Sequence, residues 1–204
     1  NEENMIRRTV ENDLEQIIDI VLQVYVRPPY PEYLNLEAWT DYIQKNHSLV
    51  YDEDGEIHAH ASLEVTGHFG VLARSFVEED FRNRGIYSEL IERRIEIARQ
   101  EGLHYLDTYV ATYSERVQKV LIEKFGFIPI GFLPLECNDV SDIGQQESLV
   151  KLRKPLLIPD NPADKREGLF PSDFDGKWSY SNEPSSLDMS KLKIYKSVRS
   201  ALSL

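Results

Sequence analysis

Hydrophobic residues follow two different spacings along the first 154 residues, and the changes of spacing separate predicted helices from predicted strands. Apolar positions three or four residues apart indicate amphipathic helices, whereas apolar positions that alternate with polar ones indicate strands. The stretches expected as strands are residues 5–8, 48–51, 57–65, 71–77, 103–111, 128–133 and 149–152. Helices are expected from Asn12 to about residue 25, around residues 36–43, from Ile86 to about Gln100, and from Ser114 to Phe125.

The helices have predicted caps and predicted buried faces. Asn12 is placed to cap the first helix, with Glu15 as its capping-box partner, and Ser114 is placed to cap the last. Gly102 and Gly126 follow helix ends, where glycine is common. The residues expected to face inward are Leu14, Ile17, Ile18, Val21, Leu22 and Tyr25; Leu36, Trp39 and Ile43; Leu90, Ile91, Ile95 and Ala98; and Val117, Val120, Leu121 and Phe125.

The order of these elements predicts an α/β (α+β) domain over residues 1–154, with a mixed sheet flanked by helices. Residues 155–204 differ in composition, because five prolines interrupt any periodicity until an amphipathic pattern returns near the end. We expect this extension to end in a helix. The helix could dock on the domain, on a second copy of the chain as in a homodimer, or on another partner.

Composition excludes several classes of function. The net charge of −12 argues against non-specific nucleic-acid binding, and no apolar run approaches the ~20 residues of a membrane span. One cysteine and five scattered histidines give no metal-ligand spacing and no internal disulfide. From this spacing we expect a protein without a metal cofactor. The first residues lack the layout of a signal peptide, and we expect a cytoplasmic protein.

One stretch, residues 76–90, has the composition of an anion-binding loop. A buried strand ends at Phe76 and Val77, an acidic turn follows, and Arg82-Asn83-Arg84-Gly85 then leads into a long helix. The first turn of a helix has unpaired backbone N–H groups and a partial positive charge, so it binds anions. The sequence predicts a pyrophosphate ligand here.

With these motifs in view, the chain resembles the Gcn5-related N-acetyltransferase (GNAT) superfamily over roughly residues 5–154. Arg82-Asn83-Arg84-Gly85-Ile86-Tyr87 is similar to the acyl-CoA loop R-x-x-G-x-G/A of that family, and a helix follows it as expected. Leu121-Ile122-Glu123-Lys124-Phe125-Gly126-Phe127 is similar to the family's L-Y-x-K-x-G-F helix ending. The order and spacing of the motifs agree with the family.

The resemblance implies a mostly antiparallel central sheet and a co-substrate, acetyl-CoA or another acyl-CoA, that donates to the amine of a small molecule or peptide. Backbone amides would hold the pyrophosphate, with Arg82 or Arg84 adding charge. Phe76 and Val77 would offer their main chain to the pantetheine arm. The residues implied for the loop are Arg82, Asn83, Arg84, Gly85, Ile86, Tyr87 and Ser88.

Two residues depart from the family pattern. Tyr87 stands where the family prefers Gly or Ala, so its side chain must turn outward or lie against the co-substrate. Ile122 replaces the tyrosine that often protonates the leaving thiolate, which leaves the general acid open. Tyr109 and Tyr113 are candidate replacements, while Cys137 has no neighbouring histidine that would make it a nucleophile.

The strand before the loop also lacks the glutamate that often serves as the family's base. Glu64, His68 and Asp107 are the candidates for that role, each with a structural alternative, and Arg74 is a candidate anchor for a substrate carboxylate. These gaps leave other functions open. One is a non-catalytic CoA-binding or regulatory module, and another is an assembly domain that acts through the C-terminal helix.

Overall fold

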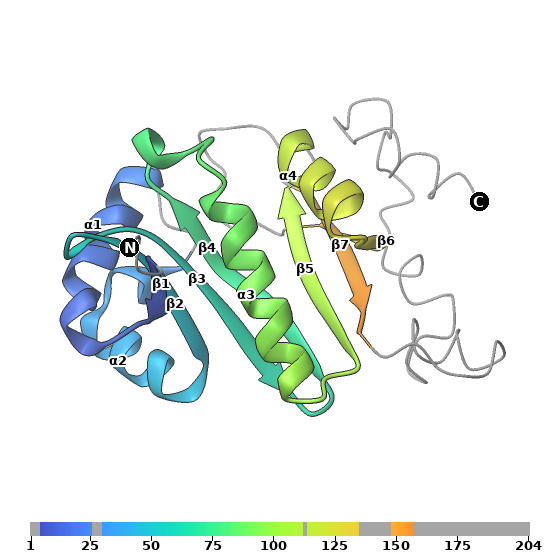
Figure 1. The fold of residues 1–204 in the computed structure, drawn as a ribbon, viewed down its shortest axis with the longest axis horizontal. Coiled ribbons are helices and arrows are strands. Elements are labelled where there is room, and N and C mark those ends of the chain that lie inside the picture. Colours follow the sequence, from blue (N-terminus) through green and yellow to red (C-terminus); the bar gives the residue numbers. More distant parts are fainter. Residues whose placement is uncertain (1–4, 26–29, 112–113, 135–147, 157–204) are drawn as a thin grey trace, which may run out of the picture. The chain divides into compact units, whose positions relative to one another are not determined.

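The computed structural model describes residues 5–25, 30–111, 114–134 and 148–156 (Figure 1). The chain divides into two compact units, residues 1–102 and residues 103–204. In each unit antiparallel strands are accompanied by helices.

The first unit contains four antiparallel strands in chain order, β1 to β4. Their bounds are Ile6–Arg8 (β1), His47–Glu53 (β2), Glu56–Thr66 (β3) and Phe69–Val77 (β4). Tight turns at Asp54-Gly55 and Gly67-His68 join the last three strands, and such turns suit Gly and Asp.

Helices cover both faces of this four-stranded sheet. The helices α1 (Leu14–Val24) and α2 (Leu36–Lys45) share one core with the sheet, and α3 (Ile86–Gln100) packs on the other face, where it crosses β3 and β4 (Figure 1). The buried residues of the first core include Leu14, Ile17, Trp39, Tyr42, Val50 and Phe76. Those of the second include Ile6, Leu49, Ala59, Ala61, Ile86 and Leu90.

The second unit contains three strands, with β7 (Ser148–Pro155) paired antiparallel to both β5 (Tyr105–Ala111) and β6 (Ile128–Pro134). Helix α4 (Glu115–Lys119) continues into a π-helical turn, Val120–Lys124. Gly126 then adopts a left-handed conformation (φ 69°), and the Phe127 amide donates to the carbonyl of Leu121 at 2.9 Å. This is the closure predicted for the Gly-Phe motif.

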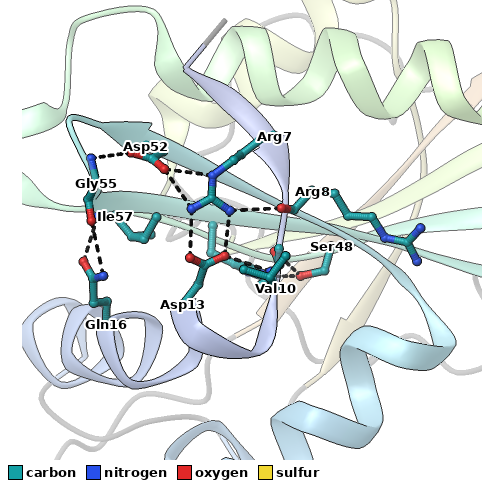
Figure 2. A network of polar contacts seen from close by, with 11 residues as sticks. Arg7, Arg8, Val10, Asp13, Gln16, Ser48, Asp52, Gly55 and Ile57 are labelled. Atoms are coloured by element: carbon teal, nitrogen blue, oxygen red, sulfur yellow. Dashed lines mark hydrogen bonds and ion pairs between the residues drawn. The ribbon is translucent and has the colours of Figure 1, made fainter.

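The start of α1 differs from the prediction. A 3-10 turn, Glu11–Asp13, precedes the helix, and Asp13 rather than Asn12 satisfies the free amide of Val10 at 2.8 Å. Both Asp13 oxygens also accept from Arg7 at 2.8 Å, and Arg7 Nε donates to Asp52 at 2.8 Å (Figure 2). One arginine of β1 therefore joins the 3-10 turn before α1 to the end of β2.

Most of the predicted elements are confirmed, including the α3 bounds and its buried residues Leu90, Ile91, Ile95 and Ala98. Two inward-facing predictions are wrong: Leu22 is 56% exposed and Leu36 is 47% exposed. Ile20 and Tyr42 are buried instead, because each helix turns a slightly different stripe toward the sheet.

The predicted boundary at residue 154 lies close to the end of the described residues and stays a prediction. The C-terminal helix, Tyr113 and Cys137 lie outside the described residues. Within the described ranges, none of the helices combines the length and hydrophobicity that a membrane crossing requires. The same ranges hold no cluster of metal-binding side chains.

Candidate functional site

The connection from β4 to α3 presents a row of backbone amides. A 3-10 turn, Glu79–Phe81, follows β4, and two residues of the next loop are left-handed, Asn83 (φ 67°) and Gly85 (φ 84°). The first intrahelical bond runs from the Glu89 amide to the Gly85 carbonyl. In the part of the chain that the structure describes, amides 83–88 have no backbone acceptor. Such a row at a helix start is an anion-binding arrangement.

Side chains fix the loop to β3 and leave its charges outside. Arg84 lies over the Phe81 ring at 4.3 Å, and Phe81 stacks on His58, with 3.6 Å between ring centroids. His58 Nδ1 is 2.7 Å from a carboxylate oxygen of Glu78. Arg82 Nε donates to the carbonyl of Val77 at 3.1 Å. Both loop arginines remain exposed, so their remaining N–H groups can meet an anion.

Some residues at the start of α3 are open to a ligand, and others are buried in the core. A Cβ atom at Gly85 would meet no protein atom within 4 Å, so the backbone is open there. Ile86 is buried and anchors the helix, and Ser88 is half-buried. Tyr87 is partly buried, and burial raises its pKa, opposed by the nearby positive charge of Arg94. Because the side chain of Ile86 is buried, only the backbone of this residue is available to a ligand.

Strand β4 contains a β-bulge ahead of the loop. His60 pairs with Phe76 and Ser62 pairs with Ala73, so Arg74 and Ser75 together oppose one residue of β3. Arg74 adopts φ 46°, which is uncommon for a residue with a side chain. Bulges of this kind redirect side chains and occur often next to active sites.

A buried histidine holds the bulge. His60 is fully buried, and its Nδ1 donates to the Arg74 carbonyl at 2.7 Å. Because that nitrogen carries the proton, Nε2 accepts from the Ser48 hydroxyl at 2.7 Å, and Ser48 contacts the Thr9 hydroxyl at 2.7 Å. Burial above all, together with the charges of Arg74 and Arg94, lowers the pKa of His60 from 6.5 to about 3, against the opposing effect of the hydrogen bond to the Arg74 carbonyl. The ring is neutral at pH 7.

Arg94 supports the bulge from the α3 side. Its side chain is fully buried, Nη1 donates to the Ser62 carbonyl at 3.0 Å and to the Ser75 hydroxyl at 2.9 Å, and Nε donates to the Leu90 carbonyl. Burial lowers the pKa of Arg94 to about 10. Its Nη2 has no partner among the described residues.

The Arg74 side chain lies on the α1/α2 side of the sheet among aromatic rings. Its guanidinium carbon is 3.5 Å from the Tyr42 ring centroid, 4.6 Å from that of Trp39 and 4.8 Å from that of Tyr33. The Tyr42 hydroxyl donates to Glu64 at 2.7 Å and lies 2.6 Å from the Ser62 hydroxyl. Burial raises the pKa of Tyr42, so this hydroxyl stays protonated.

The candidate bases in the first unit differ in position. Glu64 is half-buried on β3 and lies beside the bulge through its bond to Tyr42. His68 is exposed in the β3–β4 turn, at the opposite end of β4 from the loop, and the eight steps from Phe69 to Val77 span roughly 25 Å. Phe76 is buried among rings of the first core, so only its main chain can meet a ligand.

In the second unit, Asp107 belongs to a buried ion-pair cluster. It is 2% exposed and accepts from Arg153 Nε at 2.6 Å and Arg153 Nη2 at 2.8 Å. Lys151 Nζ lies 3.3 Å from the same carboxylate and 5.5 Å from the Tyr109 ring. Both carboxylate oxygens are engaged by Arg153, so the structural alternative for Asp107 is favoured. Tyr109 is 37% exposed.

Several residues of this site were missed by sequence reasoning. These are Tyr33, Trp39, Tyr42, His60, Ser62, Ser75 and Arg94. Arg94 had a usable signal, because it interrupts the apolar stripe of α3 between Leu90 and Ala98. The aromatic residues had none, since their spacing is that of ordinary helix cores.

Comparisons with known proteins show the family and the fold of the chain. A family model described as the acetyltransferase (GNAT) family matches residues 14–127. Among solved structures, an N-acetyltransferase from Staphylococcus aureus Mu50 is similar, with TM-score 0.63 and 22% identity over 75% of this chain and 98% of that chain. No curated sequence matches the chain.

Two further structures share the fold. The ribosomal-protein-S18-alanine N-acetyltransferase from Escherichia coli aligns with TM-score 0.62 and 18% identity, over 76% of this chain and 96% of its own. A Salmonella typhimurium protein solved with its cofactor acetyl-CoA aligns with TM-score 0.62 and 20% identity, over 77% of this chain and 96% of its own. At such identities, the likeness shows the fold alone.

Proposed function

Because the chain belongs to the acetyltransferase (GNAT) family, we propose that it is an N-acetyltransferase that moves the acetyl group of acetyl-CoA, or the acyl group of another acyl-CoA, to the amine of a small molecule or peptide. The observation that carries the proposal is the row of amides 83–88 at the start of α3, with two exposed arginines beside it. The acetyl-CoA of the Salmonella structure supports this ligand, and the Escherichia coli enzyme, named for a protein alanine, supports a peptide amine as one class of acceptor.

The loop fits a pyrophosphate on physical grounds. Asn83 and Gly85 are left-handed, which turns successive amides toward one side, and no side chain stands over Gly85. Arg82 and Arg84 add charge-assisted donors, which are stronger than neutral ones. We assign the pyrophosphate to the amides of residues 83–88, and the pantetheine arm to the main chain of Phe76 and Val77.

Acetyl transfer to an amine forms a C–N bond and breaks the thioester C–S bond. The amine nitrogen gives up a proton and the leaving sulfur gains one, so donors for the carbonyl oxygen and a proton acceptor are needed. The bulge supplies a candidate donor. In the trans peptide between Arg74 and Ser75 the carbonyl is bound by His60, so the Ser75 N–H points the opposite way, away from β3.

Glu64 is the proton acceptor that we propose. It is half-buried, and the structure shows one oxygen engaged by Tyr42 and no ion pair with a described residue. It lies two residues from Ser62, which itself pairs with the edge of the bulge. His68 lies in the β3–β4 turn, at the far end of β4 from the loop, and both oxygens of Asp107 are engaged by Arg153. We further place the protein in the cytoplasm, in keeping with its single cysteine.

The test is release of free CoA thiol from acetyl-CoA in the presence of a panel of amino acids, polyamines and peptides with free N-termini. We expect at least one amine to raise the rate, and Glu64→Gln to lower kcat for it about 100-fold without a change in CoA affinity. Glu37→Gln, at an exposed position of α2, is the matched control and should keep full activity.

If CoA binds and no amine raises thiol release, the transferase proposal fails, and the chain is then a non-catalytic CoA-binding module. If Glu64→Gln keeps its activity, the proposal stands and only the assignment of the base falls.

A further inference from the structure

Arg74 has the surroundings of a ligand-binding arginine rather than those of a structural one. The structural arginines of this chain have hydrogen-bond acceptors: Arg7 and Arg153 pair with carboxylates, and Arg94 donates to backbone carbonyls and a serine. Arg74 has three aromatic rings around its guanidinium instead, those of Tyr33, Trp39 and Tyr42. Aromatic faces attract the cation and hold it in place, but they accept few of its N–H groups.

The hydrogen-bonding capacity of Arg74 is unused. Within the described residues its guanidinium has neither a hydrogen bond nor an ion pair, and its Nη1 is buried without a partner. A buried donor without an acceptor is rare in proteins, and each instance needs an explanation. The residue as a whole is partly buried rather than fully enclosed. A carboxylate matches such a guanidinium edge with two parallel hydrogen bonds.

The neighbouring acid is held apart from this arginine. Glu64 accepts from the hydroxyl of Tyr42, whereas Arg74 lies over the face of the same ring, and the two charged groups form no ion pair within 4.0 Å. One tyrosine therefore separates an unpaired cation from a partly exposed anion. A molecule with both an amine and a carboxylate complements this pair of charges.

From this arrangement we propose that the acceptor is an amino acid or a short peptide whose carboxylate is bound by Arg74. The inference rests on the proposed transferase function for the amine, but the anion site rests on Arg74 alone. The bulge contributes to it, because the left-handed backbone at residue 74 directs this side chain toward α2. Arg74 is then a specificity residue, and it takes no part in proton transfer.

The experiment compares the twenty common L-amino acids with their C-terminal amides. Binding is measured by calorimetry with CoA present, and acetylation is measured by thiol release with acetyl-CoA. We expect at least one amino acid to bind, and to be acetylated, at least 10-fold better than its amide. Arg74→Met should abolish that preference while keeping CoA affinity, and Arg74→Lys should keep part of it. Arg8→Met removes an exposed arginine on β1 and is the matched control.

The outcomes separate the two proposals. If an acid binds preferentially through Arg74 but no acetylation occurs, the carboxylate site stands and the transferase proposal fails. If the C-terminal amides are acetylated at the same rate as the free amino acids, or if no free amino acid binds, the carboxylate site is wrong. A preference that survives in a folded Arg74→Met protein, with wild-type thermal unfolding, also overturns it.

Discussion

At the scale of single residues, the conformation of β4 depends on buried polar groups whose bonds are almost fully satisfied. His60 bonds both to the carbonyl of Arg74 and to Ser48, and Arg94 bonds to Ser62 and Ser75. These fixed partners keep the peptide group between Arg74 and Ser75 in one orientation, as a group that acts in catalysis requires. The neutral state of His60 is part of this arrangement, since a protonated ring would lose the bond that Nε2 accepts.

This buried histidine predicts a pH dependence of stability. Its pKa is about 3 in the folded protein and near 6.5 when unfolded, so the unfolded chain binds more protons between these values. Stability contributed by His60 is present above pH 6.5 and is lost as pH falls. The free energy of unfolding should therefore fall by up to about 1.4 kcal/mol per pH unit. Urea denaturation at pH 7.5, 6.5 and 5.5 measures this slope.

His60→Gln should be less stable than wild type at pH 7.5 and should have a flatter slope. His68→Gln, in an exposed turn, is the control and should keep the wild-type slope. Equal slopes for His60→Gln and wild type would show that His60 is not held neutral by the fold.

The site residues could be predicted from the sequence only where a local motif contains them. The loop residues 82–88 and Arg74 were candidates because of local chemistry, namely glycine beside arginine and an arginine in an apolar strand. Of the three rings around Arg74, Tyr33 comes from the 3-10 turn Pro31–Leu34, and Trp39 and Tyr42 come from α2. All three are far from β4 in the sequence. No local pattern predicts that they meet, because tertiary packing alone brings them together.

At the scale of elements, the periodic segments were predictable and their ends were less so. The α3 helix begins after Gly85 as predicted, because a left-handed glycine and a basic loop mark that boundary clearly. The start of α1 was misplaced, because Asn12 and Asp13 are both good capping residues. A 3-10 turn precedes the helix instead, and the Asp13 carboxylate accepts from the Val10 amide before it and from Arg7 on β1. The contact with Arg7 lies outside any local window.

The Asp13 network should therefore stabilise the first unit measurably. Asp13→Ala removes two hydrogen bonds from Arg7 and the bond to the Val10 amide, and leaves Arg7 with Asp52 and the Arg8 carbonyl (Figure 2). We expect a loss of about 2 to 3 kcal/mol in the free energy of unfolding, typical of buried charged hydrogen bonds. Chemical denaturation at pH 7 measures it.

Asp41→Ala is the comparison, because it breaks an exposed pair with Lys45 on α2. Exposed pairs are worth little, so its loss should stay below about 1 kcal/mol. Equal losses for the two variants would contradict a stabilising role for the Asp13 network. The interaction with Arg7 lowers the pKa of Asp13 against the effect of burial, so this stabilisation should weaken only when the pH falls below the usual carboxyl range.

At the scale of the whole molecule, the family and its fold could be predicted from the order of a few motifs. The acyl-CoA loop, its helix and the later Gly-Phe helix ending carry the likeness, and the family match spans the same region. The acceptor could not be predicted in this way. Its binding surface depends on side chains from separate elements, and Glu64, Arg74 and Tyr42 become one group only after folding.

The CoA affinity of the Gly85→Val protein shows whether the amides of residues 83–88 hold the pyrophosphate of acyl-CoA. The added side chain meets no protein atom, so its steric effect falls on a ligand at the loop. Gly55→Val is the matched control, since Gly55 has a similar φ (89° against 84°) and is equally open, on the β2–β3 turn. Both variants carry a comparable backbone strain of about 1 to 2 kcal/mol.

Calorimetric titration of CoA at low ionic strength gives the affinity of each folded protein. We expect Gly85→Val to weaken CoA binding at least 10-fold and Gly55→Val to bind CoA as wild type does. Equal CoA affinity for Gly85→Val and wild type would contradict the assignment of the pyrophosphate to this loop.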